Sequence, residues 1–585
     1  MPRSRPHASF RTLVALLVPA LALAGLALVG SPSSAEPRAE ADGPPRVTGH
    51  LLAINDFHGQ IDKPTGSSGN VNGTPAGGVE YLASWIKDLR ADAQAQDSRY
   101  VYTVAAGDLV GASPLVSAAF HDEPTVDEMN ALGLDVTSVG NHEFDEGVTE
   151  LKRLAEGGCH PVDGCADGDG FRGANYPMLA ANVVYKRNGR PIFPAYIVRR
   201  IGEARIGIVG MTLEGTPGIV NPAGIRQVEF LDEARTANKY ARILRAQGVK
   251  SIVLLLHEGG AQAPAPGGLN TCDGFGGPIA DIVPKLREEY RVVISGHSHQ
   301  WYNCTLANSA GVDTLVTSAG SLGRVVTDVT VKVNERSGRI VRATANNVIV
   351  ENSDPTFIDR VAKRIADAYR EAVAPIASEL VGDITADIVR DPVPSGESPL
   401  GDVIADAQLA YTQDAEAQLA LMNPGGIRAS LIYADSPGDT DGTAPGEVSY
   451  GDAFAVQPFN NLVVTQTLTG TQIKNVLEQQ FAGFAGQTTQ KILQPSAGFT
   501  YAYTASAPLG SKVSDIELDG DPVGPAETYR VTSNDFLANG GDGFTNFTAG
   551  TDRVVAPGFD VDALTAYLSD GPVAPGPADR ITLVP

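Results

Sequence analysis

SIVLLL at residues 251–256, PIADIVPKLREEY at residues 278–290 and RVVISG at residues 291–296 decide the fold class of this chain. The first and third segments are short, continuous apolar runs, and the second has helical spacing. Apolar strands that alternate with helices are typical of a parallel sheet buried on both faces. Similar strand-like segments lie upstream: VTGHLLAIN (47–55), YVYTVAAG (100–107), DVTSVG (135–140) and ARIGIVGM (204–211). The sequence therefore predicts a layered α/β domain over residues 46–350.

The pattern changes after Asp354. Residues 357–376 read FIDRVAKRIADAYREAVAPI, which places one set of apolar residues on a single helical face: Phe357, Ile358, Val361, Ile365, Tyr369 and Val373. We interpret residues 351–379 as an amphipathic linker helix. Beyond it, helix-like segments at 400–412 and 471–484 occur among strand-like ones, which predicts a second, α+β domain over residues 380–585.

The charge balance and the N-terminus indicate where the chain works. It has 585 residues with 44 Lys and Arg against 68 Asp and Glu, and no basic run, which disfavours a nucleic acid duplex as partner. Three arginines precede the apolar residues 12–30, and small residues follow up to Ala35, as in a secretory signal peptide over residues 1–35. A retained membrane anchor is the alternative. No second apolar stretch of that length follows, so we expect no membrane span after cleavage.

The four cysteines are Cys159, Cys165, Cys272 and Cys304, which allow three pairings. In an oxidising compartment the pairs nearest in sequence are the simplest choice, Cys159 with Cys165 and Cys272 with Cys304. A zinc site is the competing interpretation, but the sequence has no CxxC motif. We therefore expect two disulfides.

Polar clusters follow the predicted strands at the points where they end. In an open α/β sheet the carboxyl ends of the strands form the ligand-binding edge, so a single sheet would bring these clusters to one site. Five of the eight histidines after the signal segment belong to them. The clusters contain Asp56 and His58 (NDFHGQ), Asp108, then Asn141, His142 and Asp145 (GNHEFD), His257, and finally His297 and His299 (GHSHQ).

These side chains form a mixed oxygen and nitrogen donor set, which suits divalent transition ions better than magnesium or calcium alone. If seven of these nine side chains are ligands, they are too many for one tetrahedral site. A pair of ions that share a bridging carboxylate accounts for them. For the other three histidines, His50, His121 and His160, we expect ordinary structural roles. The acids Asp135, Asp163, Asp167 and Asp169 are expected to be solvated loop charges, with a calcium site in the 163–169 loop as a minor alternative.

The ordered motifs resemble the calcineurin-like metallophosphoesterases. The second half adds NPGGIR (423–428), QPF (457–459) and NDFLANGGDGF (534–544). The combination is similar to the secreted 5′-nucleotidase family, which includes periplasmic UDP-sugar hydrolases and 2′,3′-cyclic phosphodiesterases. The resemblance covers nearly the whole chain after the signal segment.

The resemblance implies two divalent metal ions, zinc or manganese first, with iron, cobalt or magnesium as alternatives. It implies that Asp56, His58 and His299 hold one ion, that Asn141, His257 and His297 hold the other, and that Asp108 bridges them. It further implies a catalytic dyad of His142 and Asp145. In the dyad, Asp145 would orient the imidazole that stabilises charge on the phosphoryl group and leaving group.

In the second domain the resemblance implies a nucleoside grip. A base would lie between Phe459 and Phe536, and Asp542 would bind the ribose. Asn423 and Arg428 match the base- and phosphate-contacting positions. The family often has an arginine where this chain has Pro394, and Arg390 is the candidate substitute for that phosphate contact.

Three functions remain after this reasoning. The leading hypothesis is a secreted hydrolase that releases phosphate from nucleoside 5′-monophosphates. The second keeps the site but acts on 2′,3′-cyclic nucleotides or UDP-sugars. The third is an inactive surface protein that binds nucleotides; it would have lost ligands or the dyad, and none is lost here. The substrate is a small nucleotide in the first two, and the oligomeric state is left open.

Overall fold

The computed structural model describes residues 45–585 except 65, 97, 166, 167, 169, 264–266, 435–443, 486 and 488, so the predicted signal peptide lies outside the described residues. Strand β1 (Arg46–Ile54) illustrates how the first domain is built. Its successive side chains point to opposite faces, and both faces are buried. Leu52 and Ile54 pack with helices, whereas Leu51 and Ala53 pack against the strands of a second sheet. Strand β1 therefore belongs to a sheet that has helices on one face and a second sheet on the other.

The first sheet has six strands in the order β16-β15-β1-β4-β5-β6. Strands β1, β4, β5 and β6 are parallel, and β15 and β16 add an antiparallel edge. Their bounds are β4 (Val101–Ala106), β5 (Val136–Ser138), β6 (Met178–Leu179), β15 (Val325–Asn334) and β16 (Arg339–Ile349).

A second six-stranded sheet has the order β13-β14-β12-β11-β9-β8. The sequence interpretation assumed one sheet, and this is a correction: the strand-like segments divide between two sheets that bury a common apolar layer. Strands β9, β11, β12 and β14 are parallel, with β8 and β13 antiparallel at the edges. The bounds are β8 (Tyr196–Ile201), β9 (Ala204–Thr212), β11 (Ser251–His257), β12 (Tyr290–Ser295), β13 (Trp301–Ala307) and β14 (Asp313–Ala319).

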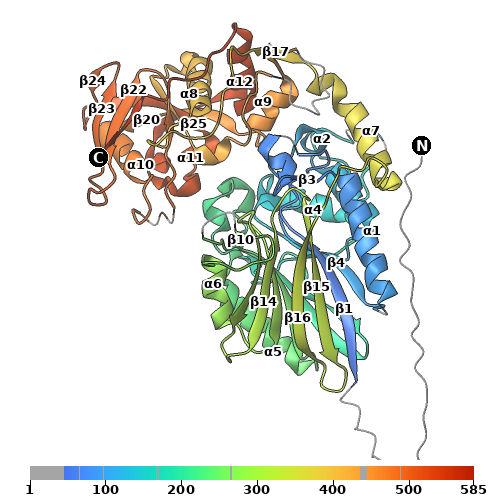
Figure 1. Cartoon of the computed structure of the whole chain (residues 1–585). Coiled ribbons are helices and arrows are strands. Elements are labelled where there is room, and N and C mark those ends of the chain that lie inside the picture. Colours follow the sequence, from blue (N-terminus) through green and yellow to red (C-terminus); the bar gives the residue numbers. More distant parts are fainter. Residues whose placement is uncertain are drawn as a thin grey trace, which may run out of the picture. The chain divides into compact units, whose positions relative to one another are not determined.

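Helices cover the outer faces of both sheets, which makes four layers. Figure 1 shows α1 running alongside β1 and β4, which it contacts. Two short strand pairs, β2 (Asn70–Val71) with β3 (Thr74–Pro75) and β7 (Val183–Tyr185) with β10 (Val228–Phe230), lie in the connections. The helices are α1 (Val79–Ala95), α2 (Leu115–Ala118), α3 (Glu123–Leu132) and α4 (Gly147–Glu156) with the first sheet, and α5 (Glu233–Ala246) and α6 (Pro278–Ile282) with the second.

Two helix expectations need correction. The helix expected over residues 278–290 ends at Ile282 and continues only as a 3-10 turn over Val283–Lys285. Pro284 explains this, because proline has no N–H for an α-helical bond. The connecting helix α7 (Arg360–Ala377) begins after the capping residue Asp359.

The buried face of α7 also differs from the predicted one. The structure buries Ala362, Ala366, Tyr369 and Val373, while Val361 is 42% exposed. Helix α7 packs against α1, α2 and α3 of the first domain and against α9 of the second. The predicted residues Tyr369 and Val373 are therefore buried together with two alanines, and the predicted Ile358 and Ile365 pack partly against the same core.

The second domain is α+β. A five-stranded sheet has the order β21-β18-β25-β20-β26, a four-stranded sheet has the order β24-β23-β22-β27, and β17 pairs with β19. Helix α10 (Gly470–Glu478) buries Ile473, Val476 and Leu477 among residues of both larger sheets. The strands are β17 (Leu380–Asp383), β18 (Leu419–Met422), β19 (Glu447–Ser449), β20 (Leu462–Thr469), β21 (Gln494–Pro495), β22 (Phe499–Thr504), β23 (Val513–Leu518), β24 (Asp521–Pro522), β25 (Thr528–Asn534), β26 (Thr551–Phe559) and β27 (Ile581–Val584). The remaining helices are α8 (Pro399–Tyr411), α9 (Tyr450–Val456), α11 (Asp535–Ala538) and α12 (Asp560–Ser569).

The predicted fold class is confirmed: a layered α/β domain is joined by a helix to an α+β domain. Pro44–Pro585 form one compact unit. None of the helices in the described part of the chain is long and apolar enough to cross a membrane.

Candidate active site

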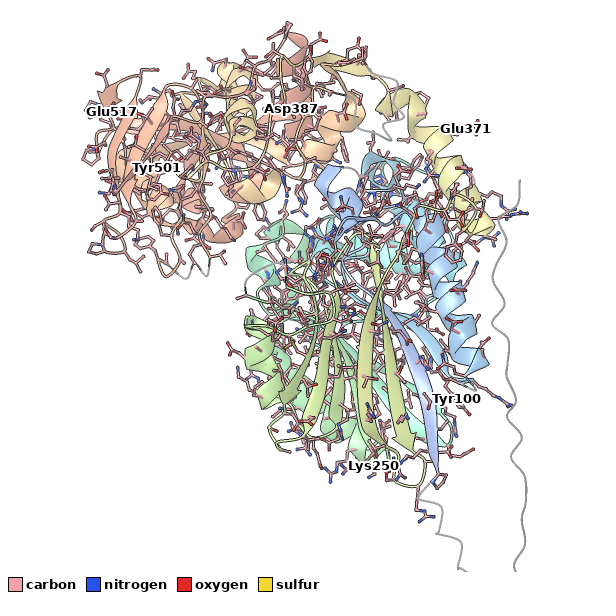
Figure 2. All side chains as sticks on the ribbon, viewed as in Figure 1. Tyr100, Lys250, Glu371, Asp387, Tyr501 and Glu517 are labelled. Carbon is pink, nitrogen blue, oxygen red and sulfur yellow. A yellow bond between two sulfur atoms is a disulfide. The ribbon has the colours of Figure 1, made fainter. Side chains whose placement is uncertain are left out.

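The polar clusters gather where parallel strands of both sheets end. Asp56, Asp108 and Asn141 follow β1, β4 and β5 of the first sheet. His257 is the last residue of β11 and His297 follows β12, both in the second sheet. Tyr100 and Lys250, labelled in Figure 2 at the far end of this domain, precede β4 and β11 and mark the opposite, amino ends. The two sheets therefore contribute to one site, which the expectation of a single sheet did not foresee.

Two groups of donor atoms lie within coordination range of an ion. In the first, His58 Nε2 is 3.0 Å from His299 Nε2, and His299 Nε2 is 3.4 Å from Asp56 Oδ1. In the second, His257 Nε2 is 2.9 Å from Asp108 Oδ2 and 3.2 Å from Asn141 Oδ1. His297 joins Asp108 and His257 in this second group.

Asp108 lies between the two groups. Its Oδ2 is 2.9 Å from His257 Nε2 and 3.8 Å from His58 Nε2. One carboxylate atom thus reaches a histidine of each group, which is what a bridging ligand requires. The structure therefore brings all seven sequence-predicted ligands into one cluster.

The cluster histidines turn Nε2 toward the other donor atoms. Two of them are neutral without metal, whereas at His257 burial is outweighed by Asp108, which raises the pKa of His257 to about 10, so an ion bound there would displace a proton. His58 Nδ1 bonds to the Gly111 carbonyl at 2.9 Å and His257 Nδ1 to the Ala106 carbonyl at 2.7 Å, so each Nδ1 donates its proton to the backbone. Each Nε2 therefore faces the cluster, where it can bind an ion. Burial lowers the pKa of His58 to about 3 and that of His297 to about 4, so both rings are neutral. The residues present fit divalent ions.

Buried acids provide the matching negative charge. Burial raises the pKa of Asp56 to about 7, which measures the cost of a buried carboxylate without a cation. Burial acts in the same direction on Asp108, but the neighbouring His257 and His142 outweigh it and hold the pKa of Asp108 well below its usual value. A divalent ion would compensate both carboxylates.

The backbone at the cluster is held in an unusual conformation. Left-handed φ angles at residues other than glycine are uncommon and cost on the order of 1–3 kcal/mol each, so they persist where the surrounding structure imposes them. Five of the seven predicted ligands have positive φ: Asp56 (50°), His58 (51°), Asp108 (50°), His297 (69°) and His299 (55°). These conformations lower the stability of the fold and direct the side chains toward one another, as is typical of a functional site.

Glycine allows the loops to approach each other. A Cβ at Gly140 would lie 2.2 Å from Asp108 Oδ1, and one at Gly296 would lie 2.9 Å from both Asp56 Oδ2 and His257 Nδ1. Only a residue without a side chain fits at these two positions. The Gly–Asn–His and Gly–His–Ser–His patterns therefore have a packing reason.

Two supporting residues were missed in the sequence analysis. The Glu143 carboxylate accepts hydrogen bonds from the backbone amides of Asp108 (3.0 Å), Leu109 (2.8 Å) and Gly140, and so ties two ligand loops together. The Asn55 side chain donates to Asp56 Oδ2 at 2.6 Å and to the Gly320 carbonyl at 2.7 Å. Both residues lie inside the quoted motifs GNHEFD and NDFHGQ, so their presence in those motifs was the available signal.

The predicted dyad is in contact. His142 Nδ1 lies 2.7 Å from Asp145 Oδ2, and the His142 amide donates to Asp108 Oδ1 at 2.9 Å. The dyad is thus tied to the bridging carboxylate. Burial alone would lower the pKa of His142, but Asp145 outweighs it and raises that pKa above its ordinary value. An imidazole that holds its proton can donate it to a developing negative charge.

Phe459 and Arg428 of the second domain lie beside the dyad. The Phe459 ring stacks on the His142 ring with 5.9 Å between centroids and 21° between planes. The Arg428 guanidinium carbon is 5.7 Å from the Phe459 centroid, in cation–π range. Burial lowers the pKa of Arg428. Asp145 and Asp108 favour its charged form, but their effect is smaller.

Asn423 and Asp542 form a second polar group. Asn423 Nδ2 donates to Asp542 Oδ2 at 2.9 Å, and Lys491 Nζ lies 2.7 Å from Asp542 Oδ1. Asn534 donates to Asn423 Oδ1 at 3.0 Å. Lys491 was missed in the sequence analysis, because a lone lysine between motifs carries no pattern.

Phe536 and Arg390 are engaged with the protein itself. Phe536 is partly buried against the core of the second domain, and its ring covers Gly541, where a Cβ would lie 2.6 Å from it. Arg390 Nη1 donates to the carbonyls of Ile427 (3.2 Å) and Arg428 (2.6 Å). Arg390 therefore supports the backbone that carries Arg428, and its direct phosphate contact stays a prediction.

The other sequence calls have mixed outcomes. Both expected disulfides, Cys159–Cys165 and Cys272–Cys304, are present. His50 bonds to Asp328 at 2.8 Å, the ordinary role expected for it. The rings of His121 and His160 stack, with centroids 3.8 Å apart, beside Asp163, and the structural roles expected for them stay a prediction. Asp167 and Asp169 lie outside the described residues.

Family models match both halves of the chain. Residues 49–301 match the calcineurin-like phosphoesterase model, and residues 376–549 match the C-terminal domain of 5′-nucleotidases. This chain belongs to the 5′-nucleotidase-like metallophosphoesterases. Members of this family are metal-dependent phosphoester hydrolases with a dinuclear divalent centre.

Individual relatives agree with this placement. The chain is 32% identical to the endonuclease YhcR of Bacillus subtilis over 83% of its own length, but spans only 37% of that protein. It is 31% identical to the cell wall protein Lmo0130 of Listeria monocytogenes, over 89% of this chain and 67% of that one. A crystal structure of a 5′-nucleotidase precursor from Thermus thermophilus matches 92% of this chain and 99% of its own, with 28% identity and a TM-score of 0.73.

Proposed function

We propose that this chain hydrolyses nucleoside 5′-monophosphates to nucleoside and phosphate. The observation that carries the proposal is the contact between Phe459 and His142. It brings an aromatic ring of the second domain against the imidazole beside the metal-ligand cluster. A base-binding surface and a phosphoryl site would therefore be adjacent, as a nucleotide with one phosphate requires.

Seven side chains would hold the metal ions. Asp56, His58 and His299 form the first set, Asn141, His257 and His297 form the second, and Asp108 bridges the two. When bound, two divalent ions polarise the phosphoryl oxygens and bring the pKa of water near neutrality. The imidazoles of the set favour zinc, and its carboxylate and amide oxygens also suit manganese.

The dyad would handle charge and protons on the leaving-group side. Asp145 accepts a hydrogen bond from the Nδ1–H of His142, which leaves Nε2 of the ring free to face the substrate. A protonated Nε2 can hydrogen-bond a phosphoryl oxygen and then donate its proton to the leaving 5′ oxygen. Typical effects of such a group on kcat are about 10² to 10⁴-fold.

The nucleoside would be gripped by the second domain. Phe459 and Phe536 offer flat apolar faces for the base, and stacking contributes about 1–3 kcal/mol per base. The Asp542 carboxylate can accept hydrogen bonds from ribose hydroxyls. Lys491 and Asn423, which now bind Asp542, hold that carboxylate in one orientation. Arg428 would attract the phosphate.

We further propose residues 46–350 as the catalytic domain, 351–379 as the connecting segment and 380–585 as the nucleotide-binding domain. We also propose that the protein works outside the cytoplasm. Two disulfides support this, because such bonds persist in oxidising compartments. The cell-wall relative in Listeria monocytogenes supports it as well.

A substrate panel with separation of the products tests the substrate. The chain is stripped of metal with a chelator, reloaded separately with Zn²⁺, Mn²⁺, Mg²⁺ or Co²⁺, and incubated with AMP, other nucleoside monophosphates, 2′,3′-cyclic AMP and UDP-glucose. Chromatography then distinguishes nucleoside plus phosphate, a ring-opened nucleoside monophosphate, and UMP plus sugar phosphate. The expected result is the highest kcat/KM on a 5′-monophosphate, with His142→Ala as the background control. Highest activity on the cyclic nucleotide or the UDP-sugar would keep the site and overturn the substrate. No turnover in any arm would overturn the enzyme proposal.

A further inference from the structure

A second cluster of metal-binding side chains lies outside the catalytic centre. His121 Nε2 is 2.9 Å from Asp163 Oδ2, and His160 Nδ1 is 3.1 Å from the same oxygen. Four ligands around a tetrahedral zinc ion, with Zn–N distances near 2.0–2.1 Å, are separated from each other by about 3.3 Å. The Asp163 oxygen is therefore spaced from each imidazole nitrogen within a few tenths of an ångström of a coordination shell, and all three donor atoms lie within 4.8 Å of one another.

Two separate segments supply these donors. His121 lies in the turn between α2 and α3, with a positive φ of 50°, followed by Asp122 at 60°. His160 and Asp163 lie in the loop after α4, which the Cys159–Cys165 disulfide closes. The backbone amides and carbonyls of His160 and Gly164 exchange hydrogen bonds at 2.9 and 3.0 Å within that loop. The disulfide and this bridge hold both loop ligands in place before any ion binds.

Glu146 supplies the outer support that histidine ligands usually have. Its Oε2 lies 3.2 Å from His121 Nδ1, so Nδ1 donates to a carboxylate while Nε2 points toward Asp163. Ligating histidines commonly donate their second N–H in this way, which fixes the ring and strengthens the ligand. The charges also balance, because the carboxylates of Glu146 and Asp163 together match one divalent ion.

The cluster is accessible from solvent. The His121 and His160 side chains are 20% and 15% exposed, and that of Asp163 is 56% exposed. An ion could enter without a rearrangement of the core, and water could complete its shell.

We propose that His121, His160 and Asp163 form a third metal site, separate from the dinuclear centre, for a divalent ion of the zinc class. Two imidazoles and a carboxylate suit zinc, nickel or copper and are too nitrogen-rich for calcium. The minor alternative of a calcium site in the 163–169 loop stays a prediction, because Asp167 and Asp169 lie outside the described residues.

Without a metal ion, a proton on His121 can supply the positive charge of this cluster. The hydrogen bond that His121 donates to Glu146 raises the pKa of His121 to about 9, so without metal the ring is an imidazolium that pairs with both carboxylates. In that state the lone pair of His160 Nδ1 accepts a 3.2 Å bond from the Asp163 amide, which an ion would replace. An ion would engage all three side chains at once and release the His121 proton.

The third site borders the dyad. A small cavity is lined by His121 and Glu146 together with His142 and Asp145. Asp122, next to His121, accepts from the Gly111 amide at 3.0 Å, and the Gly111 carbonyl binds the ring of His58. An ion here would therefore restrain the 121–122 turn, the start of α4 and the disulfide loop, and the first two of these adjoin the predicted catalytic residues.

Metal stoichiometry and anomalous diffraction test the proposal on the full chain. Chelator-stripped protein is reloaded with Zn²⁺, desalted and analysed, and crystals are measured at the zinc absorption edge. The expected result is three ions per chain with one anomalous peak between His121 Nε2 and His160 Nδ1. Two ions with no peak there would overturn the proposal and leave His121 as an imidazolium.

Variants separate this site from the dinuclear centre. His160→Gln and Asp163→Asn should each lose only the third ion, and the exposed Asp88→Asn serves as the matched control for Asp163→Asn. Asp108→Ala should lose the other two and keep the third. Glu146→Gln should weaken the third site by about 10- to 100-fold, because Glu146 only orients a ligand. A third ion retained by both His160→Gln and Asp163→Asn would contradict the assignment.

Discussion

The predicted metal-ligand end of the first domain and the proposed nucleotide-contacting part of the second domain are built differently. The seven predicted ligands are anchored at the ends of buried parallel strands, and Glu143 and Asn55 hold their loops through backbone and side-chain bonds. Phe459, Phe536 and Arg428 are only partly buried; Phe459 and Arg428 lie outside the helices and strands, and Phe536 lies in the four-residue helix α11. The comparison teaches that the sheets position the predicted ligands, whereas the proposed contacts to a nucleoside come from short, partly exposed segments.

The largest expected effect is at Asp108. Asp108→Ala removes the one carboxylate that reaches histidines of both ligand groups, and it leaves His257 buried beside the gap. We expect loss of both catalytic ions together with loss of phosphate release. Metal analysis alongside the assay checks this. A variant that keeps two ions would show that Asp108 does not bridge them.

His142→Ala should separate catalysis from metal binding within the same end of the domain. We expect both ions to remain and kcat to fall by about 10² to 10⁴-fold, since the ring stabilises charge without being a required ligand. Asp145→Asn, which keeps the size of the side chain, should lower kcat less and shift its pH profile. Loss of an ion from His142→Ala would make this histidine a ligand instead.

Sequence reasoning succeeded where residue type and strand position carried the information. The polar clusters were picked out because they follow apolar strands, and the structure brings them together. Their division into seven ligands and a dyad was implied by the family resemblance and stays a prediction. The pairing of segments into two sheets was not foreseen, because apolar runs do not reveal which sheet they join. The cluster of His121, His160 and Asp163 was also missed, since its members meet only through the approach of two loops. Lys491 was missed for the same reason.

Glu143 tests how much the supporting layer contributes. Glu143→Gln replaces one of two carboxylate oxygens, which together accept three backbone N–H bonds, with an amide NH₂ group. We expect metal affinity to weaken by about 10- to 100-fold with the fold intact. Metal titration of this variant and of the exposed Glu156→Gln control is the measurement. Equal affinities in the two variants would mean that the strands alone position the ligand loops.

The smallest expected effect on activity comes from substitutions in the second domain. It tests whether nucleoside binding and catalysis are separable. Phe459→Ala and Phe536→Ala each remove one proposed stacking face. A loss of about 1–3 kcal/mol per base corresponds to about 5- to 150-fold in kcat/KM for AMP. Hydrolysis of a small aryl phosphate, which has no purine to stack, should change little.

The quantity to measure is therefore the ratio of AMP to aryl-phosphate activity, with Phe559→Ala as control because that ring is 42% exposed on the edge strand β26. Phe459 has a second role to separate, since it also stacks on His142. If its only role is to support the imidazole, both substrates lose activity equally and the ratio stays constant. If it binds the base, the ratio falls, because binding energy from the remote nucleoside accelerates the chemical step only for a substrate that has one. An unchanged ratio in both variants would assign these rings to packing and reduce the proposal to a phosphoesterase without a nucleoside site.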